Sequence, residues 1–84
     1  MNKLFTESAW DDYLFWQKHD KQKLQKIHSL LKAIEREPFK GDGKPEPLKH
    51  DLAGKWSRRI DQEHRIIYEV KENNLILYSC RFHY

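Results

Sequence analysis

The topology of this chain follows from residues 55–78, which read KWSRRIDQEHRIIYEVKENNLILY. Apolar and polar residues alternate here with a period of two, which is the pattern of half-buried strands. Two short polar segments, DQEH and ENN, interrupt the alternation and predict turns. Strands that follow one another through such short links pair in antiparallel fashion, because a parallel pair needs a long crossover. We therefore predict an antiparallel meander whose last strand covers residues 75–84.

Two helices are predicted ahead of the meander. The first covers residues 7–18 and begins after Thr6, whose hydroxyl can accept a hydrogen bond from an N–H group of the first turn. The second begins after Asp20 and ends before Pro38, because the residue that precedes a proline resists helical backbone angles. Its apolar stripe consists of Leu24, Ile27, Leu31 and Ile34. With a short strand at residues 3–5, the fold class is α+β, with two N-terminal helices packed on one face of a twisted antiparallel β-sheet.

The composition is that of a small protein with a polar surface. The chain of 84 residues is predicted to form one domain with a thin core. Its net charge of +3 fits a polyanionic partner, although an ordinary basic surface gives the same value. Cys80 is the one cysteine, so no intrachain disulfide is possible, and we expect it to be a small buried hydrophobe. No signal peptide is visible, and no apolar run approaches the about 20 residues of a membrane span. We therefore predict a soluble cytoplasmic protein.

Alternation in the last predicted strand assigns its side chains to two faces. The more apolar set, which we predict to face the core, is Ile76, Tyr78, Cys80, Phe82 and Tyr84. Arg81 and His83 then face away from the core. Arg59 and Arg65, from the two preceding strands, can share that outer face with His83. Such a cluster is either an ordinary solvated sheet face or a site for an anion.

Glu46 lies between two prolines in the long loop that joins the helices to the meander, within the sequence KPEPLK. Proline fixes its own φ angle and forces the preceding residue toward extended backbone, so Glu46 is held stiffly. Lys44 and Lys49 flank it. The carboxylate is either a base held beside cations or an ordinary charged residue in a proline-rich bend. The sequence contains no metal-ligand spacing, no phosphate-binding glycine loop and no serine-nucleophile motif.

Four stretches, SAWDDYLFWQ, PFKGDGKPEPLKHDLAGKWSRRID, EHRIIYEV and CRFHY, resemble the YoeB toxin family in order and in spacing. This family lies within the RelE/ParE-like superfamily of bacterial toxins, and the resemblance covers nearly the whole chain. It implies the microbial-RNase-like α+β fold. It also implies the toxin of a type II toxin–antitoxin system, an endoribonuclease that cuts mRNA in the ribosomal A site and thereby inhibits translation. A cognate antitoxin of YefM type and a homodimer are further implications.

The resemblance also implies roles for individual residues. Glu46 matches the general base, His83 the general acid, and Arg65 the cation that stabilises the phosphate in the transition state. Tyr84 matches an active-site aromatic, and Lys49 and Arg59 match cations near the scissile phosphate, to which we add Lys44 beside the base. RNA carries its own nucleophile, the 2′-hydroxyl group, so a base, an acid and cations suffice without a metal or cofactor.

Two alternatives remain open at this point. A ParE-type inhibitor of DNA gyrase shares the fold but has no use for a base and an acid, so the presence of Glu46, Arg65 and His83 argues against it. A non-catalytic inhibitor that binds the ribosome would use the basic face alone.

Overall fold

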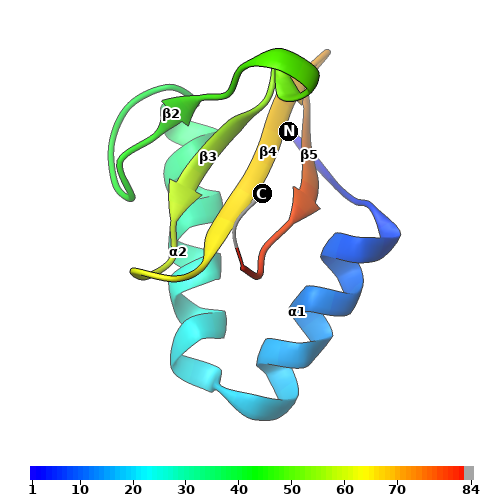
Figure 1. Cartoon of the computed structure of the whole chain (residues 1–84), viewed down its shortest axis with the longest axis vertical. Helices are drawn as coiled ribbons and strands as arrows, with labels where there is room; N and C mark the ends of the chain where they lie inside the picture. The colour runs from blue at the N-terminus through cyan, green and yellow to red at the C-terminus, as the bar shows by residue number, and fades with distance from the viewer. Residues whose placement is uncertain (83–84) are drawn as a thin grey trace.

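The chain is described by a computed structural model for residues 1–82 (Figure 1). Within these residues, five strands form one sheet of strand order β1-β5-β4-β3-β2 and two helices precede most of it in the chain, so the predicted α+β class is confirmed. In chain order the elements are β1 (Asn2–Phe5), α1 (Glu7–His19), α2 (Lys21–Arg36), β2 (Glu46–Pro47), the short 3-10 helix η1 (His50–Leu52), β3 (Trp56–Arg59), β4 (Arg65–Lys71) and β5 (Asn74–Ser79).

The predicted meander is present, and one edge of the sheet differs from the expectation. Strands β2, β3, β4 and β5 pair in antiparallel fashion, whereas β1 pairs with β5 in parallel, so the sheet is mixed. Two helices separate β1 from the meander, so no short turn fixes its direction. The β4–β5 turn has positive φ angles at Glu72 and Asn73, of 53° and 64°, as a two-residue hairpin turn of type I′ requires.

Both predicted helix starts are confirmed by side-chain caps. The Thr6 hydroxyl accepts a hydrogen bond from the N–H of Ala9 at 3.2 Å. The Asp20 carboxylate accepts from the N–H groups of Gln22 and Lys23 at 3.1 and 3.3 Å. Helix α2 ends at Arg36, before the proline that was predicted to close it. Within residues 1–82, neither helix is long and apolar enough to cross a membrane.

Figure 1 shows how the two helices lie against the sheet, and the core is formed by side chains of these helices and of the sheet. Apolar side chains of α2 pack there with buried side chains of the two longest strands, β4 and β5. The fully buried members are Ala9, Ile27, Leu30, Ile34, Ile66, Tyr68, Leu75, Leu77 and Cys80. Burial of Cys80 confirms the prediction of a small hydrophobe, and burial raises the pKa of its thiol to about 12.

The prediction for the core face of β5 was wrong. Leu75 and Leu77 are fully buried, whereas Ile76 and Tyr78 are half-buried on the other face. Both sets are apolar, so alternation could not choose between them. Phe82, also predicted in the core, is 50% exposed, and Tyr84 lies outside the described residues.

The predicted extent of the last strand was also wrong, because β5 ends at Ser79. The pairing with β4 contains a bulge: Tyr68 pairs with Leu77, but the preceding Ile67 pairs with Ser79. A bulge inserts one extra residue and bends the strand. Residues 80–82 therefore leave the sheet, although the sequence continues to alternate.

Candidate functional site

The site is built on the face of the sheet that the helices leave uncovered. Glu46 and Pro47 form the two-residue edge strand β2, in which Glu46 pairs with Ser57 of β3. This confirms the prediction of extended backbone at Glu46. A proline is tolerated here because an edge strand need not donate every hydrogen bond.

Two arginines continue this surface from β2 toward β4. Arg59 lies two residues beyond Ser57 and therefore on the same face, and it pairs directly with Arg65 of β4. The geometric part of the prediction, a shared face for Arg59 and Arg65, is confirmed. An open groove of about 330 Å³ runs between them and β2. It is lined by Lys44, Pro45, Glu46, Pro47, Ser57, Arg59 and Arg65.

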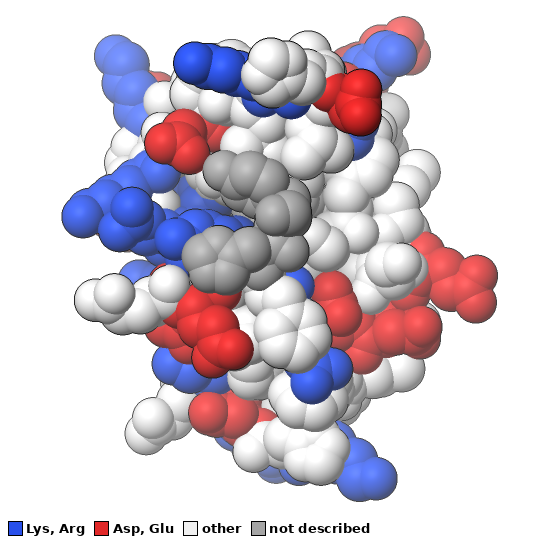
Figure 2. Space-filling model, viewed as in Figure 1, with Lys and Arg blue, Asp and Glu red and all other residues white. Residues whose placement is uncertain are grey.

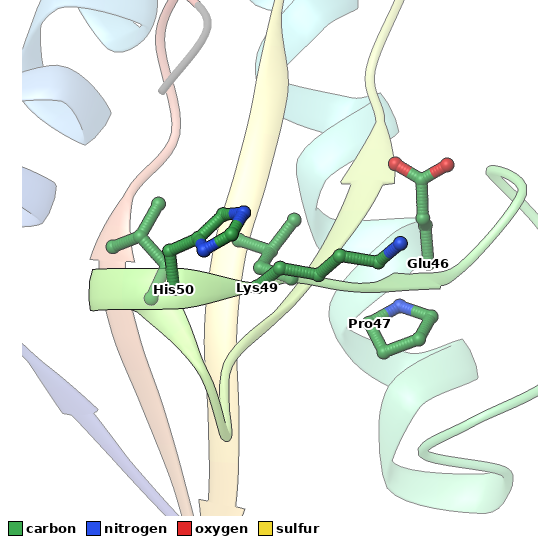
Figure 3. Close-up of a pocket in the computed structure, with 6 residues that line it drawn as sticks. Glu46, Pro47, Lys49 and His50 are labelled. Carbon is green, nitrogen blue, oxygen red and sulfur yellow. The ribbon is translucent and has the colours of Figure 1, made fainter.

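Lys49 lines the neighbouring groove, which is about 630 Å³ in volume and shares Glu46 and Pro47 with the first. In Figure 3 the Glu46 carboxylate projects away from the ribbon, and the Lys49 side chain extends along the ribbon toward Glu46. His50 also lines this groove, and its positive φ angle of 57° turns the chain out of β2 into η1. The structure thus gathers one carboxylate and several cations around β2.

A second extension of the groove lies on the side of α2. A depression of about 340 Å³ shares Lys44 and Arg59 with the groove at Glu46 and adds Lys26 of α2. Figure 2 shows Lys and Arg side chains gathered over the side of the sheet formed by β2 and β3. The charge of the site is therefore predominantly positive, which suits a ligand with several phosphates.

The side chain of Arg65 is oriented by the turn that joins β3 and β4. Its guanidinium group donates to the carbonyl oxygen of Asp61 at 3.0 Å. The Asp61 carboxylate holds that turn by accepting from the N–H groups of Glu63 and His64, and it forms an ion pair with Lys23 at 2.8 Å. Burial alone would raise the pKa of Asp61, but the hydrogen bonds from Lys23 and from the backbone lower it to about 2.

Arg58, between the groove residues Ser57 and Arg59, has a structural role that the sequence analysis missed. Its side chain is fully buried on the helix side of the sheet and donates to the hydroxyl of Tyr68. It also donates to the backbone carbonyls of three loop residues, Glu37, Lys40 and Asp42. The missed signal was the alternation of β3, in which Arg58 shares one face with the apolar residues Trp56 and Ile60 and is therefore placed on the core side.

Gly43 connects this anchored loop to the groove. Its carbonyl accepts the N–H of Arg59 at 2.7 Å, and its φ angle is 85°. A Cβ atom at Gly43 would lie 2.9 Å from a methyl carbon of Leu30 and 3.1 Å from Arg58 Cβ. Only glycine fits this position without displacing its neighbours.

His83 and Tyr84, the remaining predicted site residues, lie outside the described residues. The chain that leads to them is held by a histidine that the sequence analysis did not single out. His64 is buried, and its Nδ1 accepts a hydrogen bond from the N–H of Phe82 at 2.7 Å. No pattern in the sequence distinguishes it from the other histidines.

The fold is that of a class of small bacterial toxins. The solved structure of a YoeB/ParE toxin from Agrobacterium tumefaciens matches with a TM-score of 0.98 and 51% identity over 100% of both chains. Two structures from Staphylococcus aureus, a heterotetrameric YoeB–YefM toxin–antitoxin complex and a YoeB dimer, match with TM-scores of 0.93 and 0.94. Each is 45% identical and covers 100% of this chain and 98% of its own.

The sequence comparison identifies the family. A family model described as the YoeB-like toxin of bacterial type II toxin–antitoxin systems matches residues 5–84. Toxin YoeB of Escherichia coli strain K12 is 52% identical over 84 residues, which is 100% of both chains. The chain therefore belongs to the YoeB-like toxin family, and the resemblance in the sequence is confirmed.

Proposed function

We propose that this toxin is a ribosome-dependent endoribonuclease that cleaves mRNA in the ribosomal A site and so inhibits translation. The observation that carries the proposal is the groove in which the Glu46 carboxylate shares one sheet face with Arg59 and Arg65. A base beside cations is the arrangement that cleavage by a 2′-hydroxyl group needs. Such a reaction forms a 2′,3′-cyclic phosphate and releases a 5′-hydroxyl group.

In this mechanism Glu46 removes the proton of the 2′-hydroxyl group, and His83 protonates the departing 5′ oxygen. Histidine suits the second role because it exchanges protons near neutral pH. Tyr84 is proposed to contact the RNA beside it. Arg65 stabilises the additional negative charge on the phosphate in the transition state. Its fixed orientation on the turn carbonyl of Asp61 supports this role, because a preorganised donor need not rearrange during the reaction.

The other cations hold the substrate. Lys44 and Arg59 line the same groove as Glu46, and Lys49 lines the adjoining one, so phosphates on either side of the cleaved bond have partners. In the part of the chain that the structure describes, the two grooves at Glu46 open to solvent. An RNA strand held on the ribosome can therefore approach Glu46 directly.

Dependence on the ribosome follows from orientation. The attacking 2′ oxygen must lie in line with the leaving 5′ oxygen, and a flexible RNA strand seldom holds that geometry. Fixing reacting groups in a productive arrangement can contribute several kcal/mol to lowering a barrier. We propose that the ribosome supplies this orientation and that the toxin supplies the base, the acid and the cations.

Primer extension on an mRNA bound to purified ribosomes tests the proposal. We expect a cut inside the A-site codon with ribosomes and no comparable cut of the same RNA without them. Glu46→Gln should abolish the cut while ribosome binding is retained, and Glu72→Gln, a matched change in the exposed β4–β5 turn, should leave it unchanged. An intact message with the unchanged protein would contradict the proposal.

The same experiment separates the alternatives. A non-catalytic ribosome-binding inhibitor would stop translation without a cut, and Glu46→Gln would not weaken it. A ParE-type gyrase inhibitor would block DNA supercoiling by purified gyrase and leave translation unaffected. The carboxylate in the cationic groove favours the nuclease, because neither alternative requires it.

Two protein partners are proposed from the relatives. The Staphylococcus aureus relatives form a YoeB–YefM complex and a YoeB dimer, and we propose a YefM-type antitoxin and a homodimer for this chain as well. An mRNA-cutting toxin acts in the cytoplasm. Mass measurement of the purified chain, alone and with the antitoxin encoded beside it, tests both partners: a monomer alone would contradict the dimer, and no complex would contradict the antitoxin.

A further inference from the structure

We infer that Asp12, Trp16 and His64 are positioning residues: they clamp residues 80–82, the segment after β5 that directly precedes His83 in the chain. The inference rests on the proposed function of His83 as the acid. None of the three side chains lines either groove that contains Glu46. Asp12 and Trp16 belong to the stretch SAWDDYLFWQ, which the proposed reaction leaves without a role.

The clamp begins at Cys80, one residue beyond the end of β5. Its N–H donates to the Asp12 carboxylate at 3.0 Å, and its carbonyl accepts from the indole N–H of Trp16 at 2.8 Å. Both partners lie on α1. Cys80 is itself fully buried, and its thiol points to the Ala9 carbonyl at 3.7 Å. Side chains of α1 thus replace the sheet hydrogen bonds that the chain loses when it leaves β5.

Phe82 is held in the same way by the turn between β3 and β4. Its N–H donates to His64 Nδ1 at 2.7 Å, and its carbonyl accepts from the backbone N–H of Arg65 at 3.0 Å. The carbonyl of Phe82 belongs to the peptide group that joins it to His83. The clamp therefore reaches the covalent bond that precedes the proposed acid.

The backbone of Phe82 indicates that these hydrogen bonds impose its conformation. Its φ angle is 62°, in the left-handed region that residues with a bulky side chain seldom adopt. Such a conformation persists only where the surroundings hold it. Because the Phe82 ring is half exposed, the two backbone hydrogen bonds carry much of that restraint.

Arg81, between the two anchored residues, is fixed by stacking. Its guanidinium carbon lies 3.4 Å from the centre of the Phe15 ring and 4.5 Å from that of Phe82. Trp16 packs edge-on against the His64 ring with 4.8 Å between ring centres, which joins the α1 half of the clamp to the turn half. The segment is therefore attached to one connected group of side chains.

The clamp is also connected directly to the groove. Arg65 directs its side chain into the groove and uses its backbone N–H to hold Phe82. The strand β2 with the proposed base Glu46, the groove residue Arg65 and the backbone of Phe82 are thus fixed relative to one another. A small displacement of an acid from its leaving group is costly, since about 1 Å of misplacement can reduce a rate about 100-fold.

Substitutions at His64 separate positioning from a role in stability alone. Asparagine offers an amide oxygen at about the place of Nδ1, so His64→Asn keeps an acceptor for the N–H of Phe82, whereas His64→Leu removes it. In steady-state cleavage on ribosomes, we expect His64→Leu to lower kcat about 10- to 100-fold with KM within about twofold. His64→Asn should restore most of kcat. The matched control is the pair His28→Leu and His28→Asn on the exposed face of α2, both of which should cleave like the unchanged protein.

Trp16→Phe keeps an aromatic ring and removes only the donor to Cys80, and it serves as the second variant if His64→Leu does not fold. Wild-type kcat in whichever of these variants is folded would overturn the inference, as would a His64→Asn protein that is no better than His64→Leu. Hydrogen exchange of the Phe82 amide gives a readout that needs no cleavage: we expect protection in the unchanged protein and its loss in His64→Leu. An unprotected Phe82 amide in the unchanged protein would also overturn the clamp. A protein with a protected amide that does not cut mRNA would instead contradict the proposed function.

Discussion

Arg59 and Arg65 lie directly opposite each other on β3 and β4, and both side chains line the groove on the uncovered face of the sheet. Like charges in opposed positions on neighbouring strands destabilise a sheet. Glu46, which lines the same groove, lies opposite Ser57 of β3 in the strand register. The arrangement is unfavourable for the folded protein alone and favourable for a phosphate bound between the two guanidinium groups.

The first prediction follows from this opposition. Arg59→Gln removes one of the two like charges, and we expect it to raise the free energy of unfolding by about 0.2–1 kcal/mol while cleavage falls. Urea denaturation at low salt measures the first effect, and primer extension on ribosomes measures the second. High salt should reduce the gain in stability because it screens the repulsion. A less stable Arg59→Gln protein at low salt would contradict the repulsion.

Arg58 is predicted to respond in the opposite way. Arg58→Lys keeps the positive charge but cannot reach all the carbonyls of Glu37, Lys40 and Asp42, so buried acceptors lose their donors. Each unsatisfied buried group costs about 1–3 kcal/mol, and we expect a total loss of about 2–4 kcal/mol. Urea denaturation measures it, and limited proteolysis should find new cuts in residues 37–44. Arg59→Lys is the matched control, because this exposed neighbour should change stability by less than about 0.5 kcal/mol. Equal stability of the two variants would contradict the assignment.

These two neighbouring arginines also show what the sequence could and could not predict. Alternation correctly put Arg59 on the same face as Arg65, and the caps at Thr6 and Asp20 correctly located both helix starts, because these signals depend on residues close together in the chain. The four carbonyl and hydroxyl partners of Arg58 come from positions 10 to 21 residues away, and no local pattern records them.

The end of β5 could not be predicted for the same reason. The sequence alternates through residue 84, but the bulge opposite Ile67 and the hydrogen bond from Cys80 to Asp12 of α1 depend on tertiary structure. Because both faces of β5 are apolar, the pairing of Leu77 with Tyr68 decided which face is buried. His64 was missed because its partner, the N–H of Phe82, lies 18 residues further along the chain.

The third prediction concerns pH and Asp61. The pKa of this carboxyl is about 2 in the folded protein, against an ordinary value of 3.8. Because the folded value is the lower one, the ionised form stabilises the fold above about pH 4, and this contribution is lost as the pH falls toward 2. It amounts to about 1–2 kcal/mol at neutral pH, allowing for partial exposure of the side chain. Asp61→Asn should therefore be less stable than the unchanged protein at pH 7, with the difference shrinking as pH falls from 4 to 2.

Urea denaturation at pH 7, 4 and 2.5 measures this convergence. Asp42→Asn is the control, since Asp42 is exposed and uses only its backbone carbonyl to hold Arg58. Its stability should follow that of the unchanged protein at every pH. A difference between the Asp61→Asn and unchanged proteins that stays constant down to pH 2.5 would mean that the carboxylate charge contributes nothing.

The last prediction uses Lys26, whose depression shares Lys44 and Arg59 with the groove at Glu46. If the RNA strand extends toward α2, Lys26 neutralises a phosphate beyond the cleaved bond, where it affects binding and not the chemical step. Lys26→Gln should then raise KM with kcat unchanged. In binding of the inactive Glu46→Gln protein to programmed ribosomes, adding Lys26→Gln should reduce the slope of log affinity against log salt concentration by about 0.7–0.9. Lys32→Gln is the matched control on the same helix, because Lys32 lies outside this depression and outside the groove at Glu46. The same salt slope for Lys26→Gln and Lys32→Gln would mean that the RNA does not follow the surface toward α2. A lower kcat of Lys26→Gln would mean that Lys26 acts closer to the chemical step than its place on the helix indicates.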